Sequence, residues 1–207
     1  MSKKCLVIPR EVLLEKHFTG FMPKYFHDYL AIINQEENQR FLDRYETSVV
    51  QEIPVEEDPS LKQPIPYIVV MHLGKVFVYE RAPPGVNTEA RLASKLSIGV
   101  GGHIEPFDDA DNLIISSIKR EIQEELGYFD DVLLEHKGYI NFEESEVDKV
   151  HFGLIFKVEI KKPDFSFDNS EIVHGRFTSV DELKSQEIYG RLENWSKALV
   201  DNIDRII

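Results

Sequence analysis

The sequence predicts an α+β fold in which a mixed β-sheet is sandwiched between α-helices. Short apolar runs rich in β-branched and aromatic residues recur through the middle of the chain. Helical periodicity appears near both ends, and a strand, a glycine turn and a helix follow one another across residues 97–126. Because a sheet and an amphipathic helix each bury one apolar face, this order favours helices packed on both faces of one sheet.

Composition limits the functions that the chain can have. The 207 residues carry a formal net charge of -13, which argues against a surface for nucleic acid or anionic membrane. This net charge is compatible with a phosphorylated small molecule as the ligand, because a bound metal ion inverts the local electrostatic potential. The single Cys5 excludes an intramolecular disulfide and is expected to be a small core residue. No apolar run approaches the ~20 residues of a membrane span, so a cytoplasmic protein is expected.

Residues 1–60 are expected to form an N-terminal α/β extension, and residues 61–207 the main domain. The extension is predicted to contain a strand at Cys5–Ile8, helices at Pro23–Ile33 and Glu36–Tyr45, and a strand at Thr47–Ile53. The segment Pro54–Pro66 contains four prolines and lacks periodicity, which is typical of a boundary or linker.

A β-hairpin is the clearest local signal of the main domain. Its strands are predicted at Ile65–Leu73 and Lys75–Arg81, separated by Gly74. Ala82–Leu96 reads as a long loop, and loops of this length in a compact domain are often functional. A strand at Ser97–Val100 then leads into a glycine turn.

The helix that follows, Leu113–Leu126, brings three carboxylates to one side. Glu121, Glu124 and Glu125 stand at i, i+3 and i+4, beside an apolar stripe of isoleucines. Unpaired carboxylates so close together raise one another's pKa values, and a hard divalent cation relieves the repulsion. Gly127 is predicted to end the helix in a left-handed conformation. A solvated acidic face is the plainer interpretation of this spacing.

The rest of the chain alternates strands with helices. We expect strands at Leu133–Ile140, Val150–Ile160 and Glu171–Phe177, a helix capped by Ser179, and a final helix at about Ile188–Ile206.

The segment from Gly101 to Tyr128 resembles the signature of the Nudix hydrolases, G-x5-E-x7-R-E-U-x-E-E-x-G-U, in which U is bulky and apolar. Residues 120–128, Arg-Glu-Ile-Gln-Glu-Glu-Leu-Gly-Tyr, match its whole second half. The first half departs from the pattern, because residues 102–120 are four residues longer than the signature permits. The mid-box glutamate has no clear equivalent among Asp108, Asp109 and Asp111, and Asp111 or Asn112 is expected to cap the helix.

The resemblance implies a Nudix fold and hydrolysis of a phosphoanhydride in a nucleoside diphosphate linked to another group, with Mg²⁺ or Mn²⁺ as cofactor. Glu121 and Glu125 are the implied metal ligands, with Glu124 as a third and the Gly101 carbonyl as a fourth. The resemblance also implies a catalytic role for Glu121. For the general base the resemblance offers Glu171, and Glu144 and its neighbours Glu143 and Glu146 compete for the role.

Other residues are expected to support this chemistry. Arg120 is expected to orient Glu124, and Gly102 to allow close approach of the backbone to the ion. Glu105 is expected either to support the metal site or to orient Arg120. Phosphate contacts are expected from Arg81, Lys95 and Arg91, although each also fits a plain surface charge. His103 either contacts substrate or faces solvent, and His151 and His174 lack a spacing that suggests a metal site.

Two other functions remain open at this level. An isomerase like the isopentenyl diphosphate isomerases shares the fold but needs a cysteine beside the site, and Cys5 lies in another segment. A ligand sensor without turnover commonly loses box glutamates, whereas Glu121, Glu124 and Glu125 are all present. The expected partner is a small nucleotide diphosphate derivative, and homodimers are frequent in the family.

Overall fold

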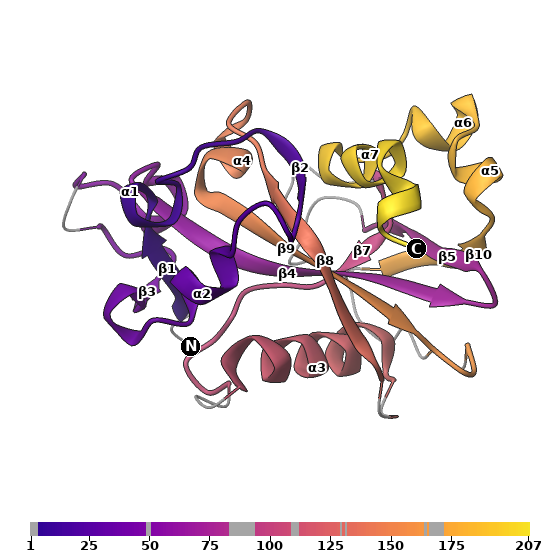
Figure 1. Cartoon of the computed structure of the whole chain (residues 1–207), viewed down its shortest axis with the longest axis horizontal. Helices are drawn as coiled ribbons and strands as arrows, with labels where there is room; N and C mark the ends of the chain where they lie inside the picture. Colours follow the sequence, from indigo (N-terminus) through magenta and orange to yellow (C-terminus); the bar gives the residue numbers. More distant parts are fainter. Residues whose placement is uncertain are drawn as a thin grey trace. The chain divides into compact units, whose positions relative to one another are not determined.

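The structure, a computed structural model, describes residues 4–48, 51–82, 94–108, 112–128, 130, 132–163, 165 and 172–207. It is an α+β fold with a large mixed sheet (Figure 1). The strands are β1 Lys4–Pro9, β2 Gly20–Pro23, β3 Arg40–Asp43, β4 Leu61–His72, β5 Lys75–Arg81, β6 Leu96–Ser97, β7 Gly99–Val100, β8 Leu134–Asn141, β9 His151–Glu159 and β10 Ile172–Thr178. The helices are α1 Arg10–Leu13, α2 Tyr29–Ile33, α3 Leu113–Leu126, α4 Glu146–Val150, α5 Val180–Leu183, α6 Gln186–Tyr189 and α7 Asn194–Asp201.

The strands follow the order β10-β5-β4-β9-β8-β2, with β1, β3, β6 and β7 paired off this path. The chain divides into two compact units. The first unit comprises Met1–Pro66, Gly102–Ser117 and Gly138–Leu154, and the second comprises Tyr67–Gly101, Ile118–Lys137 and Ile155–Ile207. The expected division into residues 1–60 and 61–207 stays a prediction.

In the first unit, β1 pairs antiparallel with β3 and with the start of β4, and β2 pairs with β8. These pairings correct several sequence predictions. The expected helix Pro23–Ile33 is helical only over α2, which the Asp28 side chain caps by accepting from Ala31 N at 3.1 Å. The expected helix Glu36–Tyr45 is a 3-10 turn followed by β3, because ladder pairing with β1 outweighs a short helical periodicity.

One further prediction for this unit, the strand at Thr47–Ile53, was wrong, and the expected boundary segment has structure of its own. The described part of Thr47–Ile53 is a turn, with Thr47 bridged only to Pro54 and Glu52 at a φ of 59°. The predicted linker Pro54–Pro66 contains a 3-10 helix, Val55–Glu57, and the buried beginning of β4. Cys5, Val7, Val55 and Leu61 form an apolar cluster here, which explains why this proline-rich stretch is ordered.

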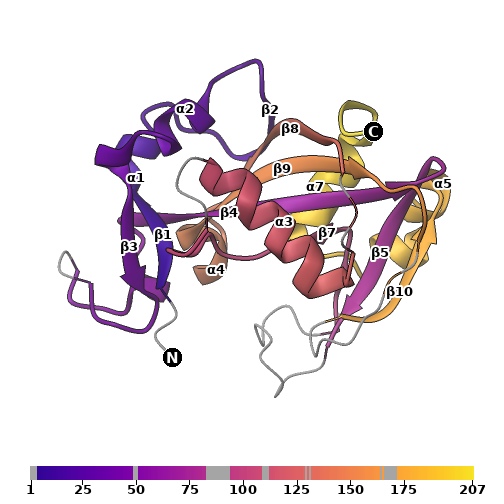
Figure 2. The same cartoon turned by 90° about the horizontal axis from the view of Figure 1, so that it is seen from below.

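In the second unit, the predicted hairpin is confirmed as β4 and β5. Leu73 and Gly74 both have positive φ values, 49° and 73°, which matches the tight turn that a hairpin of this twist prefers. Helices α3 and α7 lie on opposite faces of the sheet in this unit, as the two views show (Figures 1 and 2).

The predicted final helix Ile188–Ile206 is broken. Residues 191–193 instead bond to β6, with Leu96 N donating to Arg191 O and Glu193 N donating to Leu96 O, each at 3.0 Å. This backbone pairing with a strand interrupts the helix between α6 and α7. Helix α4 was also absent from the prediction, although Ser145 and Asp148 form a full capping box for it. Within the described ranges, no helix has the length and apolarity to span a membrane.

Gly99 of β7 allows a close approach that we expect to be essential for stability. A Cβ atom at this position would lie 1.8 Å from Cε1 of Tyr67, a buried ring whose hydroxyl is held by Glu193 at 2.6 Å. Gly99→Ala should therefore lower the free energy of unfolding by about 2–4 kcal/mol, measured by urea denaturation. Gly74→Asn is the control, since the turn has open space and asparagine tolerates positive φ. Equal stability of Gly99→Ala and wild type would contradict this packing.

Candidate functional site

The C-terminal half of α3 carries the predicted carboxylates in the second unit. Glu121 is buried at 6% exposure, whereas the Glu124 side chain is 57% exposed. Arg120 Nη1 donates to Glu121 Oε1 at 2.7 Å and to Glu124 Oε2 at 3.1 Å. The predicted contact between Arg120 and Glu124 is present, and the same guanidinium also holds Glu121.

Glu121 lies in an environment that disfavours its ionised form. Burial raises the pKa of its carboxyl to about 7, and the negative charges of Glu125 and Glu124 act in the same direction. Arg120 opposes them through its charge and its hydrogen bond. The helix therefore collects more negative charge than one arginine neutralises. Oxygen donors at this spacing fit a hard divalent cation.

One glycine of the box, Gly127, takes the conformation that its predicted role requires. Gly127 has a φ of 61° and donates its N–H to Gln123 O at 3.0 Å, so it ends α3 as predicted. Gly101 ends the segment Tyr67–Gly101 of the second unit and has a φ of 155°. The ligand role of its carbonyl stays a prediction.

The first half of the box continues in the first unit with Gly102 and Glu105. Glu105 N donates to Asp108 Oδ2 at 2.8 Å, and Asp108 N donates to Glu105 O at 3.1 Å. This reciprocal pair closes a tight turn and gives Asp108 a structural use. Asp109 and Asp111 lie outside the described residues, so the capping of α3 by Asp111 is not described.

Among the predicted phosphate contacts, Arg81 faces a buried carboxylate in the second unit. Its Nε atom lies 3.4 Å from Glu193 Oε2, and its guanidinium lies 5.8 Å from the centre of the Tyr79 ring. Lys95 is exposed, and its backbone carbonyl accepts from Arg81 N at 2.9 Å. Arg91 lies outside the described residues. Arg81 and Lys95 are thus adjacent through their backbones.

Glu193 anchors a buried polar network that the sequence analysis missed. Its Oε1 atom accepts from Tyr67 Oη and from Ser97 Oγ, each at 2.6 Å, and Ser196 Oγ lies 3.3 Å away. Burial, followed by the charge of Glu193, holds the pKa of Tyr67 well above its ordinary value. Tyr67 lies in β4, Ser97 in β6 and Ser196 in α7, and Glu193 directly precedes α7, so no local spacing could have indicated this cluster.

The candidates for the general base fall in different places. Glu144 is exposed and follows β8 in the first unit. Its neighbour Glu143 is paired with Arg10 Nη1 at 2.7 Å and Lys62 Nζ at 3.0 Å, and these contacts contribute to a lowered pKa. Glu146 pairs with Lys149 at 2.7 Å. Glu171 lies outside the described residues, so its role stays a prediction.

One further cluster in the first unit was not expected from the sequence. The side chains of Glu56, His103 and His151 bring their ligand atoms within 4.8 Å of one another. These residues lie in three distant segments, which is why the spacing of His151 suggested no metal site.

Comparison with known proteins assigns the chain to a family. No family model matches the sequence. Protein YmaB of Bacillus subtilis (strain 168) is 33% identical over 211 residues, which cover 99% of this chain and 98% of YmaB. The crystal structure of Tm1382, a protein assigned to the Nudix hydrolases, superposes with a TM-score of 0.71 at 26% identity, covering 97% of this chain and 98% of that one.

A third comparison supports the fold alone. The Nudix domain of Shewanella oneidensis NrtR, solved in complex with ADP ribose, has a TM-score of 0.54 at 10% identity and covers 69% of this chain and 86% of that domain. YmaB and Tm1382 each align with nearly the whole length of this chain. The chain belongs to the Nudix hydrolase superfamily and to the same family as YmaB.

Proposed function

We propose that the protein is a divalent-metal-dependent pyrophosphohydrolase that cleaves a phosphoanhydride bond in a nucleoside diphosphate linked to another group. The observation that carries the proposal is the carboxylate cluster of α3, in which buried Glu121 stands beside Glu124 and Glu125. Membership of the Nudix hydrolases supports the reaction class. The ADP ribose bound to NrtR supports a nucleotide derivative as the substrate class.

Glu121, Glu124 and Glu125 would hold Mg²⁺ or Mn²⁺, with the Gly101 carbonyl as a further donor. The donor set fits, because it consists of oxygens and its excess negative charge is relieved by a cation. When bound, such an ion neutralises the phosphate oxygens and lowers the pKa of a coordinated water. Arg120 orients Glu121 and Glu124 through its two hydrogen bonds.

Binding and proton transfer fall to other residues in this proposal. Arg81 and Lys95 supply positive charge for the phosphates of the substrate. The Glu193 carboxylate, held by Tyr67 and Ser97, fixes the guanidinium of Arg81. Glu144 or Glu171 takes the proton of the attacking water. Glu143 is a weaker candidate, because Arg10 and Lys62 already occupy its carboxylate.

The structure argues against the isomerase alternative. Cys5 is fully buried in β1, and its thiol donates to Gln63 Oε1 at 3.4 Å. Burial raises the pKa of this thiol to about 12, so it carries its proton at neutral pH. The residue fills space in the apolar cluster of the first unit, as the sequence analysis expected.

A panel assay tests the proposal. The protein is incubated with Mg²⁺ and nucleotide sugars, dinucleoside polyphosphates, ADP ribose and nucleoside triphosphates, and released nucleoside monophosphate and phosphate are quantified. We expect Mg²⁺-dependent release from at least one class. Tight binding of one compound without turnover would support a ligand sensor instead and would contradict the proposal.

The pKa of Glu121 predicts an unusual pH dependence of stability. In metal-free protein the folded state binds this proton up to about pH 7, whereas the unfolded chain releases it near 4.5. The folded state therefore holds more protons between these values, and the contribution of Glu121 to stability falls as pH rises through them. Urea denaturation in EDTA across this window should show this fall, and Glu121→Gln should remove it. An identical pH profile in wild type and variant would contradict the assignment.

A further inference from the structure

Three side chains from distant segments meet in the first unit. Glu56 lies in the 3-10 helix Val55–Glu57, His103 two residues after Gly101, and His151 at the first position of β9. The Nε2 atoms of the two histidines are 3.4 Å apart, and all three ligand atoms fall within 4.8 Å of one another. None of the carboxylates of α3 belongs to this cluster.

The contact between the His151 ring and the Val147 carbonyl fixes the tautomer of the ring. Its Nδ1 atom lies 2.7 Å from Val147 O, and a carbonyl oxygen only accepts, so Nδ1 carries the proton. The neutral ring then presents the lone pair of Nε2 to His103. A histidine that donates its other N–H to a backbone carbonyl is the usual arrangement of a metal ligand.

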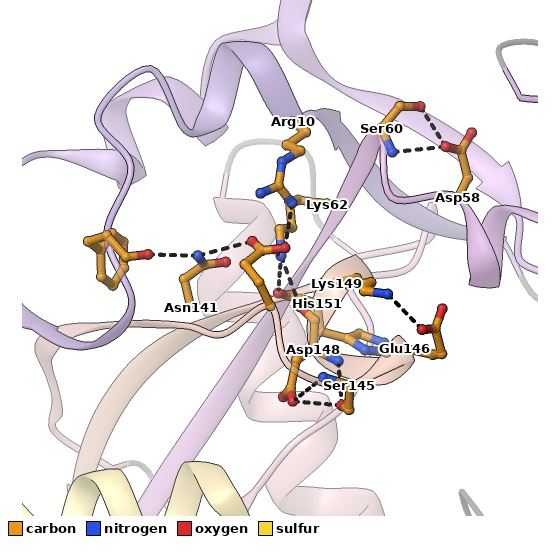
Figure 3. Close-up of polar contacts among 12 residues, drawn as sticks. Arg10, Asp58, Ser60, Lys62, Asn141, Ser145, Glu146, Asp148, Lys149 and His151 are labelled. Atoms are coloured by element: carbon orange, nitrogen blue, oxygen red, sulfur yellow. Dashed lines mark hydrogen bonds and ion pairs between the residues drawn. The ribbon is translucent and has the colours of Figure 1, made fainter.

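The backbone of His151 is held in place by a buried cation. Lys62 is fully buried and donates from Nζ to Asp148 O at 2.9 Å and to His151 O at 3.2 Å (Figure 3). These bonds fix the junction between α4 and β9, where the imidazole is attached. The ring of His151 is therefore positioned before any ligand arrives.

The spacing of the nitrogens fits a four-coordinate ion better than a hydrogen bond. Two imidazole nitrogens bound to one tetrahedral zinc ion at ~2.05 Å are ~3.4 Å apart, which matches the observed 3.4 Å. The same 3.4 Å is long for a direct hydrogen bond, since N–H···O bonds normally measure roughly 2.7–3.2 Å.

Glu56 is oriented toward this role by a fixed arginine. Its two oxygens accept from Arg44 Nε and Nη2, each at 2.7 Å, and a carboxylate has about four acceptor sites, which is more than these two bonds use. The surroundings are acidic as well. Burial is the main cause of the raised pKa of the neighbouring Cys5 thiol; Arg44 lowers this pKa, and the charges of Glu56, Asp43 and Glu105 raise it. A divalent cation would balance this excess.

We propose that His103, His151 and Glu56 form a zinc site, with Nε2 of each histidine and one carboxylate oxygen as ligands and the fourth position open to water. Two imidazoles with one carboxylate favour Zn²⁺ over Mg²⁺, which prefers oxygen donors alone. The ion would join three segments of the first unit that are far apart in the chain.

Calorimetric titration with Zn²⁺ of chelator-treated, full-length protein tests this site. Wild type should bind one equivalent tightly, and an excess of Mg²⁺ should not displace it. His103→Asn and His151→Asn should each weaken binding by more than about 100-fold, since loss of a mere supporting contact already costs 10–100-fold. His17→Asn is the matched control, because His17 is an exposed histidine of the same unit, outside the cluster. Unchanged affinity in both cluster variants would overturn the proposal.

Nitrogen chemical shifts of the imidazoles provide a second measurement that needs no variant. In wild-type protein, one equivalent of Zn²⁺ should shift the Nε2 resonances of two histidines, which keep their protons on Nδ1. Resonances of the other histidines should stay in place. Absence of tight binding, or Zn²⁺ shifts confined to other histidines, would mean that the pair shares only a long hydrogen bond.

Discussion

Replacement of Glu125 by glutamine should lower the rate of hydrolysis by at least about 1,000-fold, because the proposed metal site would lose one of its carboxylate ligands and several kcal/mol of charge stabilisation would depend on it. The substitution is nearly isosteric, so the fold should persist, as judged by circular dichroism and urea denaturation. The rate is measured on the substrate that the panel identifies, at saturating Mg²⁺.

Glu11→Gln provides the comparison, since Glu11 is an exposed glutamate in the first turn of α1. Its rate should stay within a factor of about two of wild type. Glu124→Gln should have a smaller effect than Glu125→Gln, because the Glu124 side chain is 57% exposed and already pairs with Arg120. A wild-type rate in Glu125→Gln would show that the glutamate face of α3 does not hold the metal.

Replacement of Lys62 by methionine should strongly destabilise the protein. The ammonium group is fully buried and is held by the carboxylate of Glu143 and two backbone carbonyls. Methionine fills similar space but leaves these acceptors without their donor. We expect the free energy of unfolding to fall by about 2–4 kcal/mol, measured by urea denaturation.

Arg10→Met is the control for this effect. Arg10 pairs with the same glutamate at 2.7 Å, but its side chain is 30% exposed and water can replace it. Its loss should cost less than about 1 kcal/mol. Equal losses of stability in the two variants would contradict this account. They would mean that the burial of the Lys62 ammonium group makes no difference to the cost of removing it.

Local patterns gave the correct structure where local interactions decide it. Helix α3 has the predicted bounds, Leu113–Leu126, because its apolar stripe is regular and Gly127 ends it with positive φ. The hairpin of β4 and β5 was also predicted, since Leu73 and Gly74 form a turn that its own sequence favours.

Predictions failed where distant backbone pairing decides the structure. Residues 40–43 become β3 through bonds to β1, and residues 191–193 leave the helical path to bond to Leu96. Neither partner is close in sequence, so periodicity within a short window pointed to helices.

The residues of the candidate sites also fall into two groups, those placed by local spacing and those brought together by tertiary structure. The box carboxylates Glu121, Glu124 and Glu125 share one helix. Their spacing in the sequence was sufficient to predict that they lie on the same side of it. The network around Glu193 and the cluster of Glu56, His103 and His151 each join segments dozens of residues apart. Such clusters depend on tertiary structure, and one sequence contains no local trace of them.

The most direct test of the central claim is hydrolysis of the identified substrate in ¹⁸O-labelled water, with Mg²⁺ and with EDTA, followed by mass spectrometry of the products. Metal-dependent attack of water at phosphorus predicts turnover only with the ion, and one ¹⁸O atom in a phosphate group of a product. Undiminished turnover in EDTA, or label found only in the non-phosphate product, would contradict the account.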